Sequence, residues 1–313
     1  MSGLDPNAFP IHRARLEHTE IAYLRENPGG FPLLLLHGWP ETKRIWWGNI
    51  ARLAEAGFEV IVPDLRGFGD SGLAQDERYD VAAHSRDMEA LVRGELGHQH
   101  CVVCAGDLGG LVAQDVSLRF EGLVERMVLF NTIPPFLDKA YQEAGIEPGL
   151  PPTVRQAADY FRRQSTDADG LAAELDTPDK RRDYVAQMYG SRFWAAPGAF
   201  EPADVDFMTE PFAEPERFRA SIANYEYVGG ARRAPEVPRL LEPNPTRTLV
   251  LYGPEDHVIG PTFPRQMEVA FPEIVGPFEV AGAGHFLMWE RPQVLNRALE
   301  SFCLDLLRES PLE

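Results

Sequence analysis

The sequence predicts an α/β protein with a mostly parallel sheet of eight strands, helices on both faces and an inserted helical segment. Short apolar runs alternate with helix-like stretches, and each run ends in a loop rich in Gly, Pro, Asp or His. This rhythm stops between about residues 134 and 243. At 313 residues the chain is long enough for one large domain that carries such an insertion.

The strands are expected in a definite order. Residues 12–27 alternate between apolar and polar with period two, which predicts an antiparallel hairpin at the start of the sheet. Parallel strands are predicted at residues 33–36, 59–62, 101–105, 127–130, 248–252 and 277–280. Ligands bind at the carboxyl ends of the strands in such sheets, so we expect the functional residues in the loops that follow them.

The segment without strands is expected to form a helical cap, or lid, over residues 134–243. This insertion after the sixth strand divides the core into residues 1–133 and 244–313. Its helical stretches are bounded by Pro and contain many Tyr, Phe and Trp residues. We expect these aromatic side chains both to pack the lid onto the core and to line an apolar substrate cavity.

Composition excludes several classes of partner. Apolar residues make up 44% and charged residues 25% of the chain, and no apolar run approaches the ~20 residues of a membrane span. A net charge of −18 opposes binding to nucleic acid and to anionic membranes. The first residues lack the basic and then apolar pattern of a secretory signal, so we expect a cytoplasmic protein. A small neutral ligand fits this composition, and a homodimer stays open.

The cysteines do not indicate a metal or redox site. Cys101 and Cys104 lie three positions apart in an apolar run that is predicted to be a strand. Side chains three apart on a strand face opposite sides, so core packing is favoured over zinc binding or redox chemistry for both thiols. We expect neither a metal nor another cofactor.

The strongest local motif surrounds Asp107, which lies between small residues directly after a predicted strand, in the run AGDLGG. Small residues permit a sharp strand-to-helix turn that exposes the central side chain above the sheet, as in a nucleophile elbow. The following helix is expected to begin near Gly109. The alternative is that Asp107 merely caps a helix over residues 111–120.

Two further residues favour a catalytic role. Asp256 follows the strand predicted at residues 248–252, and His285 follows the last predicted strand. The chain order of nucleophile, acid and histidine, each at the carboxyl end of a strand, is one of the orders known for catalytic triads, and it makes Asp107 the nucleophile. Glu255 and Asp64 remain alternative acids.

A motif at the first parallel strand completes the set, with His37 and Gly38 followed by Trp39 and Pro40. Together with the runs DLRGFGDS, AGDLGG, GPED and GAGH, it resembles the epoxide hydrolase branch of the α/β-hydrolase superfamily, over about residues 10–133 and 244–308. The resemblance implies the α/β-hydrolase fold, a cis peptide before Pro40, and an oxyanion hole formed by the N–H groups of Trp39 and Leu108. His37 is assigned no catalytic role, since it and Pro40 can simply shape the loop.

An aspartate nucleophile also restricts the reaction by itself. A carboxylate is ionised at neutral pH and can displace a leaving group at an sp3 carbon, which gives an alkyl ester on the enzyme. Attack on an ester or amide would instead leave a strained anhydride. Epoxides and alkyl halides are therefore favoured over esters and peptides. In the second half-reaction, His285 oriented by Asp256 is expected to activate the water that hydrolyses the ester.

The leaving group distinguishes the remaining substrates. The resemblance implies two lid tyrosines that protonate an epoxide oxygen. Tyr225, in the run SIANYE, matches the second of them, and Tyr160, in the run ADYFR, is the candidate for the first. Both are expected to bind substrate together with Trp39. Tyr189 and Tyr227 are the substitutes, and lid packing is the alternative role for all four.

The dehalogenase patterns are absent. Halide-releasing relatives place Trp after the nucleophile and Asn after the first His-Gly, where this chain has Leu108 and Trp39, and it lacks the Arg that binds haloacetates. The chain also departs from the epoxide hydrolase pattern, with Gly106 where His usually precedes the nucleophile and Leu108 where Trp often follows it. The expected function is the opening of a small apolar epoxide by water to a vicinal diol. The alternatives are a haloalkane or haloacid dehalogenase and a non-catalytic small-molecule sensor.

Overall fold

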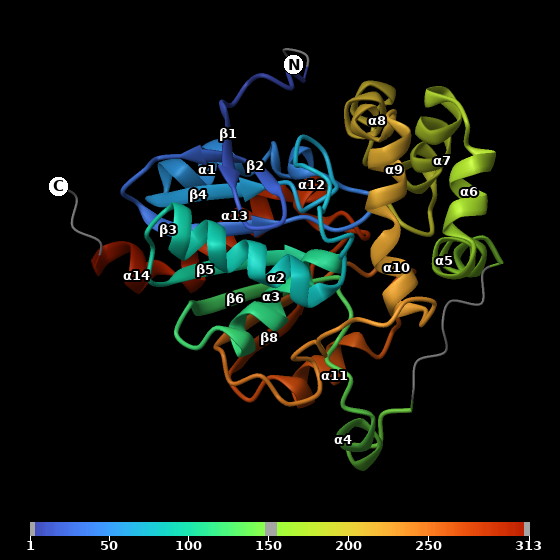
Figure 1. The fold of residues 1–313 in the computed structure, drawn as a ribbon. Helices are drawn as coiled ribbons and strands as arrows, with labels where there is room; N and C mark the ends of the chain where they lie inside the picture. Colours follow the sequence, from blue (N-terminus) through green and yellow to red (C-terminus); the bar gives the residue numbers. More distant parts are fainter. Residues whose placement is uncertain (1–3, 148–154, 310–313) are drawn as a thin grey trace.

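A twisted sheet of eight strands forms the centre of the computed structural model, which describes residues 4–147 and 155–309 (Figure 1). Residues 148–154, which belong to the predicted lid, lie outside the described part. The strands are β1 (Ile11–Arg15), β2 (Glu20–Glu26), β3 (Phe31–Leu36), β4 (Phe58–Pro63), β5 (Cys101–Gly106), β6 (Val124–Phe130), β7 (Thr248–Tyr252) and β8 (Ile274–Glu279).

The sheet has the strand order β1-β2-β4-β3-β5-β6-β7-β8. Strand β2 pairs antiparallel with β1 and β4, and all other pairings are parallel. The predicted fold class is therefore confirmed. The last strand overlaps its predicted range but begins three residues earlier, at Ile274 and not at residue 277, as β6 begins at Val124 and not at residue 127. Strand β8 is an edge strand of half-buried and exposed residues with an irregular register, so its apolar pattern is weak.

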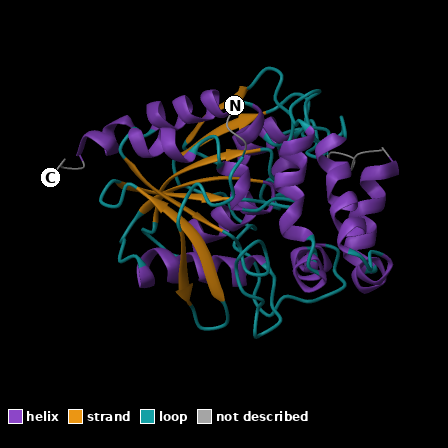
Figure 2. Ribbon diagram, turned by 90° about the horizontal axis from the view of Figure 1, so that it is seen from above, coloured by secondary structure: helices purple, strands orange, loops and turns teal. Residues whose placement is uncertain are grey.

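The central strands consist of continuous apolar runs for a physical reason. Every residue of β3, β4 and β5 is buried, as expected for parallel strands that are covered on both faces. Helices cover both faces of the sheet (Figure 2), with α2 packed against α3 and α1 packed against α13. Cys101 and Cys104 are buried in β5 as free thiols. The helices of the core are α1 (Ile50–Glu55), α2 (Val81–Glu89), α3 (Asp107–Arg119), α11 (Phe263–Ala270), α12 (Leu287–Glu290), α13 (Pro292–Phe302) and α14 (Leu304–Glu309), with shorter turns η1 (Lys43–Trp46) and η2 (Ala90–Glu95).

A group of helices lies between β6 and β7 in the chain, where the lid is predicted, and beside one end of the sheet in space (Figure 1). Polar caps fix several of their starts. Thr177 accepts a hydrogen bond from the Lys180 N–H, and Glu201 forms a capping box with Asp204. These helices are α4 (Asp138–Glu143), α5 (Arg155–Thr166), α6 (Ala168–Glu174), α7 (Pro178–Gly190), α8 (Pro202–Thr209), η3 (Glu210–Phe212), α9 (Pro215–Ser221) and α10 (Ala223–Val228).

Ion pairs and hydrogen bonds connect these helices, α4 to α10, which are called the lid below, to the core. Arg44 of η1 pairs with Glu210 at 2.6 Å, and Arg217 of α9 donates hydrogen bonds to the carbonyl oxygens of Gly69 and Ser71. In the described parts of the chain, no helix has the length and apolar character needed to cross a bilayer.

Candidate active site

Asp107 lies at a tight turn between β5 and α3. Its φ of 43° falls in the left-handed region, which residues other than Gly rarely adopt. The turn needs small neighbours. A Cβ at Gly106 would lie 2.5 Å from the ring of Phe130, and a Cβ at Gly109 would lie 2.7 Å from the carbonyl oxygens of Leu36 and His37. The strained backbone and the crowded glycines together match a nucleophile elbow.

Helix α3 begins at Asp107 itself, not near Gly109 as the sequence predicted. The capping alternative is also wrong. The N-cap position belongs to Gly106, and the Asp107 side chain turns away from the helix to accept a 2.8 Å hydrogen bond from the Trp39 N–H. The left-handed φ at Asp107 makes the turn tighter than residue types alone indicate, so no residues are left between strand and helix.

The structure brings the three residues of the predicted triad together. His285 Nε2 lies 3.4 Å from Asp107 Oδ2, and His285 Nδ1 lies 2.9 Å from Asp256 Oδ2. The other oxygen of Asp256 accepts hydrogen bonds from the N–H groups of Val258 and Ile259, at 2.8 and 3.2 Å. The acid is thus fixed by its own loop, and it holds the imidazole with Nε2 directed toward the nucleophile.

The charges around the imidazole favour its protonated form. Burial alone would lower the pKa of His285, but the carboxylates of Asp256 and Asp107 raise the pKa well above its ordinary value. If Asp107 becomes an ester, its negative charge disappears and one of these stabilising interactions is lost. The pKa of His285 then falls, which makes the neutral imidazole available as a base.

The predicted oxyanion hole is only partly visible in this structure. The N–H of Trp39 contacts Asp107 Oδ1, and the peptide bond between Trp39 and Pro40 is cis. Leu108 directly follows the nucleophile at the start of α3. The structure gives no hydrogen bond from the Leu108 N–H to the carboxylate of its described neighbour Asp107.

The rings of the two predicted lid tyrosines meet edge-on, and both contact Trp39, whose N–H binds the nucleophile. Tyr160 lies on α5 and Tyr225 on α10, with ring centroids 6.0 Å apart. Both pack on Trp39, with centroids at 5.8 and 5.6 Å. Burial and, for each hydroxyl, the negative charge of Asp107 raise both pKa values well above that of free tyrosine. Both hydroxyls therefore stay protonated and can act as hydrogen-bond or proton donors.

Trp194 is a further aromatic side chain of the lid that packs against His285 and Tyr160. The Trp194 ring meets the His285 ring edge-on at 4.8 Å and lies 5.1 Å from the Tyr160 ring. Tyr160 and Trp194 also line a cavity of about 560 Å³ among α5, α6 and α7, whose apolar walls include Leu171 and Met188. The cavity has the size of a small-molecule site.

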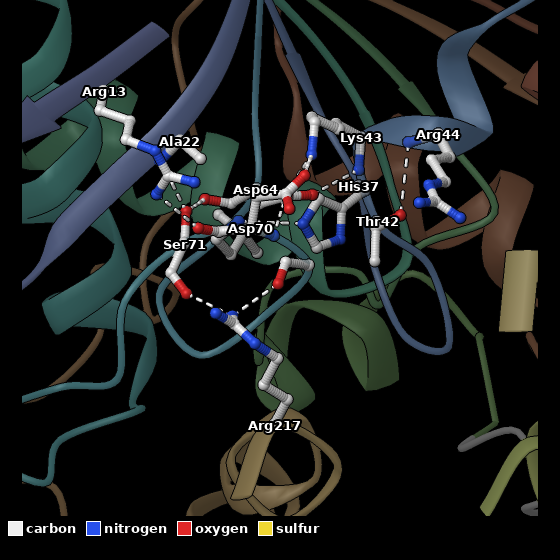
Figure 3. A network of polar contacts seen from close by, with 12 residues as sticks. Arg13, Ala22, His37, Thr42, Lys43, Arg44, Asp64, Asp70, Ser71 and Arg217 are labelled. Carbon is white, nitrogen blue, oxygen red and sulfur yellow. Dashed lines mark hydrogen bonds and ion pairs between the residues drawn. The ribbon is translucent and has the colours of Figure 1, made fainter. Parts of the chain in front are cut away.

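The alternative residues lie elsewhere. Asp64 is fully buried and binds Lys43, whose Nζ is 2.6 Å from Asp64 Oδ2 and also contacts Asp70 (Figure 3). The two oxygens of Asp64 thus serve the loops at the ends of β3 and β4. Glu255 is exposed.

The substitute tyrosines also have other partners. The Tyr189 hydroxyl donates a hydrogen bond to the Pro40 carbonyl oxygen, and Tyr227 packs in a separate small cluster with Tyr79.

Three residues near the triad were not predicted from the sequence. Trp194 carried no signal, because it lies in the lid far from any strand end. Glu41 directly follows the His-Gly-Trp-Pro run, is fully buried, and accepts a 2.6 Å hydrogen bond from the Gly38 N–H. Its burial and the charge of Asp107 raise its pKa to about 7. Asn131 follows β6 directly, so the rule that located the triad also points to it.

Comparisons with known proteins agree with this architecture. Residues 32–292 match the model of the alpha/beta hydrolase fold family. A soluble epoxide hydrolase of Corynebacterium sp. (strain C12) is 29% identical over 292 residues, which cover 93% of this chain and 96% of that protein. Epoxide hydrolase A of Mycobacterium tuberculosis is 26% identical, with coverages of 89% and 92%. The solved structure of epoxide hydrolase CorEH superposes with a TM-score of 0.80 at 24% identity, over 95% of this chain and 99% of that one.

Proposed function

The chain belongs to the alpha/beta hydrolase fold family, and on that basis we propose that it is an epoxide hydrolase that works through a covalent ester on Asp107. The observation that carries the proposal is the position of the Asp107 carboxylate. One of its oxygens is bound by a backbone N–H, the other faces a histidine that an acid holds, and its charge acts on two protonated tyrosines that pack on Trp39.

The first half-reaction opens the ring. Asp107 Oδ2 attacks one epoxide carbon, the carbon–oxygen bond to that carbon breaks, and an ester forms. The epoxide oxygen leaves as an alkoxide and takes a proton from the hydroxyl of Tyr160 or Tyr225. A carboxylate suits this step because it is already ionised and attacks an sp3 carbon without a base.

The second half-reaction removes the product. His285, held by Asp256, takes a proton from water, and the resulting hydroxide attacks the carbonyl carbon of the Asp107 ester. The Trp39 and Leu108 N–H groups stabilise the oxyanion, by about 3 to 4 kcal/mol for each donor in comparable sites. The intermediate collapses to the diol and a carboxylic acid on Asp107, and the diol oxygen takes the proton from His285. The acid proton, which came from the water, then passes to the tyrosinate and restores both the tyrosine and the Asp107 carboxylate. One epoxide and one water thus give one diol.

An apolar substrate fits the surroundings of the nucleophile. The rings of Trp39, Tyr160 and Trp194 offer mainly apolar surface, and Tyr160 and Tyr225 offer two hydroxyl donors, which suits a small epoxide with a hydrocarbon substituent. The carboxylates of Asp256 and Asp107 already balance the imidazolium, which disfavours an anionic substrate such as a haloacetate beside the nucleophile. The protein acts in the cytoplasm without a cofactor.

A single turnover in oxygen-18 water tests the mechanism. Styrene oxide is mixed with excess enzyme, and peptides and diol are analysed by mass spectrometry. The label is expected in the Asp107 side chain after the first turnover, whereas the first diol carries the unlabelled oxygen of Asp107. Label that appears directly in the first diol would mean that water attacks the epoxide itself. Release of halide from a haloalkane, without diol from any epoxide, would assign the site to dehalogenation.

A further inference from the structure

Asn131 contacts all three loops that carry the triad. It directly follows β6, is 1% exposed, and has a φ of 42° in the left-handed region. Its backbone carbonyl oxygen accepts a 3.0 Å hydrogen bond from the Asp107 N–H. Asn is among the few residue types that adopt this backbone conformation without a large penalty, so the residue type fits the position.

The side chain of Asn131 binds the other two loops. Its Nδ2 donates hydrogen bonds to the carbonyl oxygens of Gly284 and His285, at 2.6 and 3.1 Å. Its Oδ1 accepts a 3.0 Å hydrogen bond from the N–H of Gly253, which begins the turn that leads to Asp256. The amide thus uses both donor hydrogens and its acceptor, each on a loop that carries a catalytic side chain.

We propose that Asn131 is a positioning residue that fixes the Asp256–His285 pair relative to Asp107, and that it serves the hydrolysis of the ester more than its formation. This inference rests on the proposed function. The attack by Asp107 needs the elbow, to which Asn131 contributes its backbone carbonyl. The activation of water needs His285 at its 3.4 Å distance from Asp107, to which Asn131 contributes its side chain.

The backbone of His285 makes two hydrogen bonds, one to the lid and one to the core. The His285 N–H donates a 2.7 Å hydrogen bond to the Trp194 carbonyl oxygen on the lid side, and Asn131 binds the His285 carbonyl oxygen from the core. Without the Asn131 amide, the Trp194 carbonyl oxygen and Asp256 still hold His285. The loop of Asp256, however, loses the hydrogen bond from the Gly253 N–H. A misplacement of about 1 Å in a reacting geometry can cost on the order of 100-fold in rate.

The substitution Asn131→Asp tests the donor role with little change in shape. Aspartate keeps the volume, tolerates the left-handed backbone, and retains an oxygen for the Gly253 N–H. It replaces the Nδ2 donor with an oxygen that faces two carbonyl oxygens, so two attractive contacts become repulsive. Asn131→Gly, which also accepts the positive φ, removes the amide without adding a charge and serves as the second variant.

The experiment measures the two half-reactions separately with styrene oxide. Rapid quenching and intact-protein mass spectrometry give the rates at which the alkyl-enzyme forms and disappears. For both variants we expect hydrolysis to slow by on the order of 100-fold while ester formation changes by less than about 5-fold, so the alkyl-enzyme accumulates. In the steady state, kcat and KM then fall together and kcat/KM changes little, which a general loss of folded protein would not produce.

Thr132→Val is the matched control. Thr132 is the buried neighbour of Asn131, and its hydroxyl donates a 2.6 Å hydrogen bond to the carbonyl oxygen of Asp107 and to neither of the other described loops. We expect no selective accumulation of ester in this variant. Equal slowing of both half-reactions in Asn131→Asp and Asn131→Gly, or unchanged hydrolysis in both, overturns the positioning role. Absence of diol from the unaltered protein would instead contradict the proposed function.

Discussion

The N–H of Trp39 donates a 2.8 Å hydrogen bond to Oδ1 of Asp107, and this bond gives the two carboxylate oxygens different environments. Oδ1 is held by the backbone in the place where an oxyanion forms. Oδ2 receives no hydrogen bond from the backbone of residues 4–147 and 155–309, and it lies 3.4 Å from the His285 imidazole. Oδ2 is thus the oxygen available for attack, and Oδ1 is the one that carries charge during hydrolysis.

Replacement of the triad residues should separate the two half-reactions. Asp107→Asn removes the charged nucleophile, so we expect no adduct with styrene oxide and a rate at background. His285→Gln leaves the nucleophile but removes the base, so the alkyl-enzyme should accumulate to nearly one per protein. Intact-protein mass spectrometry measures both results. Full steady-state turnover by the His285→Gln protein would exclude the imidazole from the mechanism.

The tyrosine pair should act mainly on ring opening. General-acid catalysis typically contributes about 10²–10⁴-fold, and two donors share it here. We expect Tyr160→Phe and Tyr225→Phe each to slow ester formation by on the order of 10- to 100-fold, and the double variant by more. The rate of ester formation in single turnovers measures this effect. Tyr227→Phe is the control, since Tyr227 packs in a separate cluster. A double variant that forms ester at the normal rate would contradict the role of the pair.

Glycine is required at position 38 for a local steric reason. A Cβ at Gly38 would lie 2.8 Å from Cγ of Asp107 and closer still to two other atoms of that side chain. Gly38→Ala must therefore displace the nucleophile or the loop that carries the Trp39 N–H. We expect a loss of at least 100-fold in kcat/KM with a cooperative thermal unfolding transition that is retained.

The matched control for this substitution is Gly94→Ala. A Cβ there meets no atom within 4 Å, and the position has no left-handed φ. The Gly94→Ala protein should keep its activity. Normal activity in the Gly38→Ala protein would mean that the close approach of loop and carboxylate is dispensable.

Stability should depend on pH through Glu59, far from the site. Burial alone would raise the pKa of Glu59, but hydrogen bonds from His98, the Gly29 N–H and Arg25 lower it to about 2 from its ordinary value of 4.5. Its ionised form therefore stabilises the folded state above pH 4.5, by on the order of 3 kcal/mol. This contribution is lost as the pH falls from 4.5 toward 2.

Chemical unfolding at pH 7, 5 and 3 measures this effect. The difference in unfolding free energy between the unaltered protein and Glu59→Gln should be largest at pH 7 and shrink toward pH 3. A difference that is the same at all three values would show that the charge of Glu59 does not cause it.

The sequence predicted the sheet well because buried parallel strands leave continuous apolar runs, and it predicted the triad because each member lies in the loop after a predicted strand. The start of the edge strand β8 was predicted three residues too late, since its half-exposed residues leave a weak pattern. The start of α3 depends on the left-handed φ of Asp107, which residue types do not reveal.

The lid was harder to predict in detail. Tyr160 and Tyr225 were found through a family resemblance, because helices without strand ends offer no rule that selects a residue. Trp194 meets His285 only through the folding of the lid over the core, and nothing in the local sequence indicates that contact. Asn131 is different, because it follows β6 as Asp107 follows β5, and the same positional rule would have selected it.

The three buried cysteines have a consequence for a protein that handles electrophiles. Epoxides alkylate thiolates, yet burial raises the pKa of Cys101 and Cys303 to about 12 and that of Cys104 well above the usual value for a thiol. At neutral pH these side chains stay protonated and out of reach in the core. The polypeptide is thereby protected from self-inactivation by its own reactant, and the electrophile is directed to the one aspartate from which water can release it.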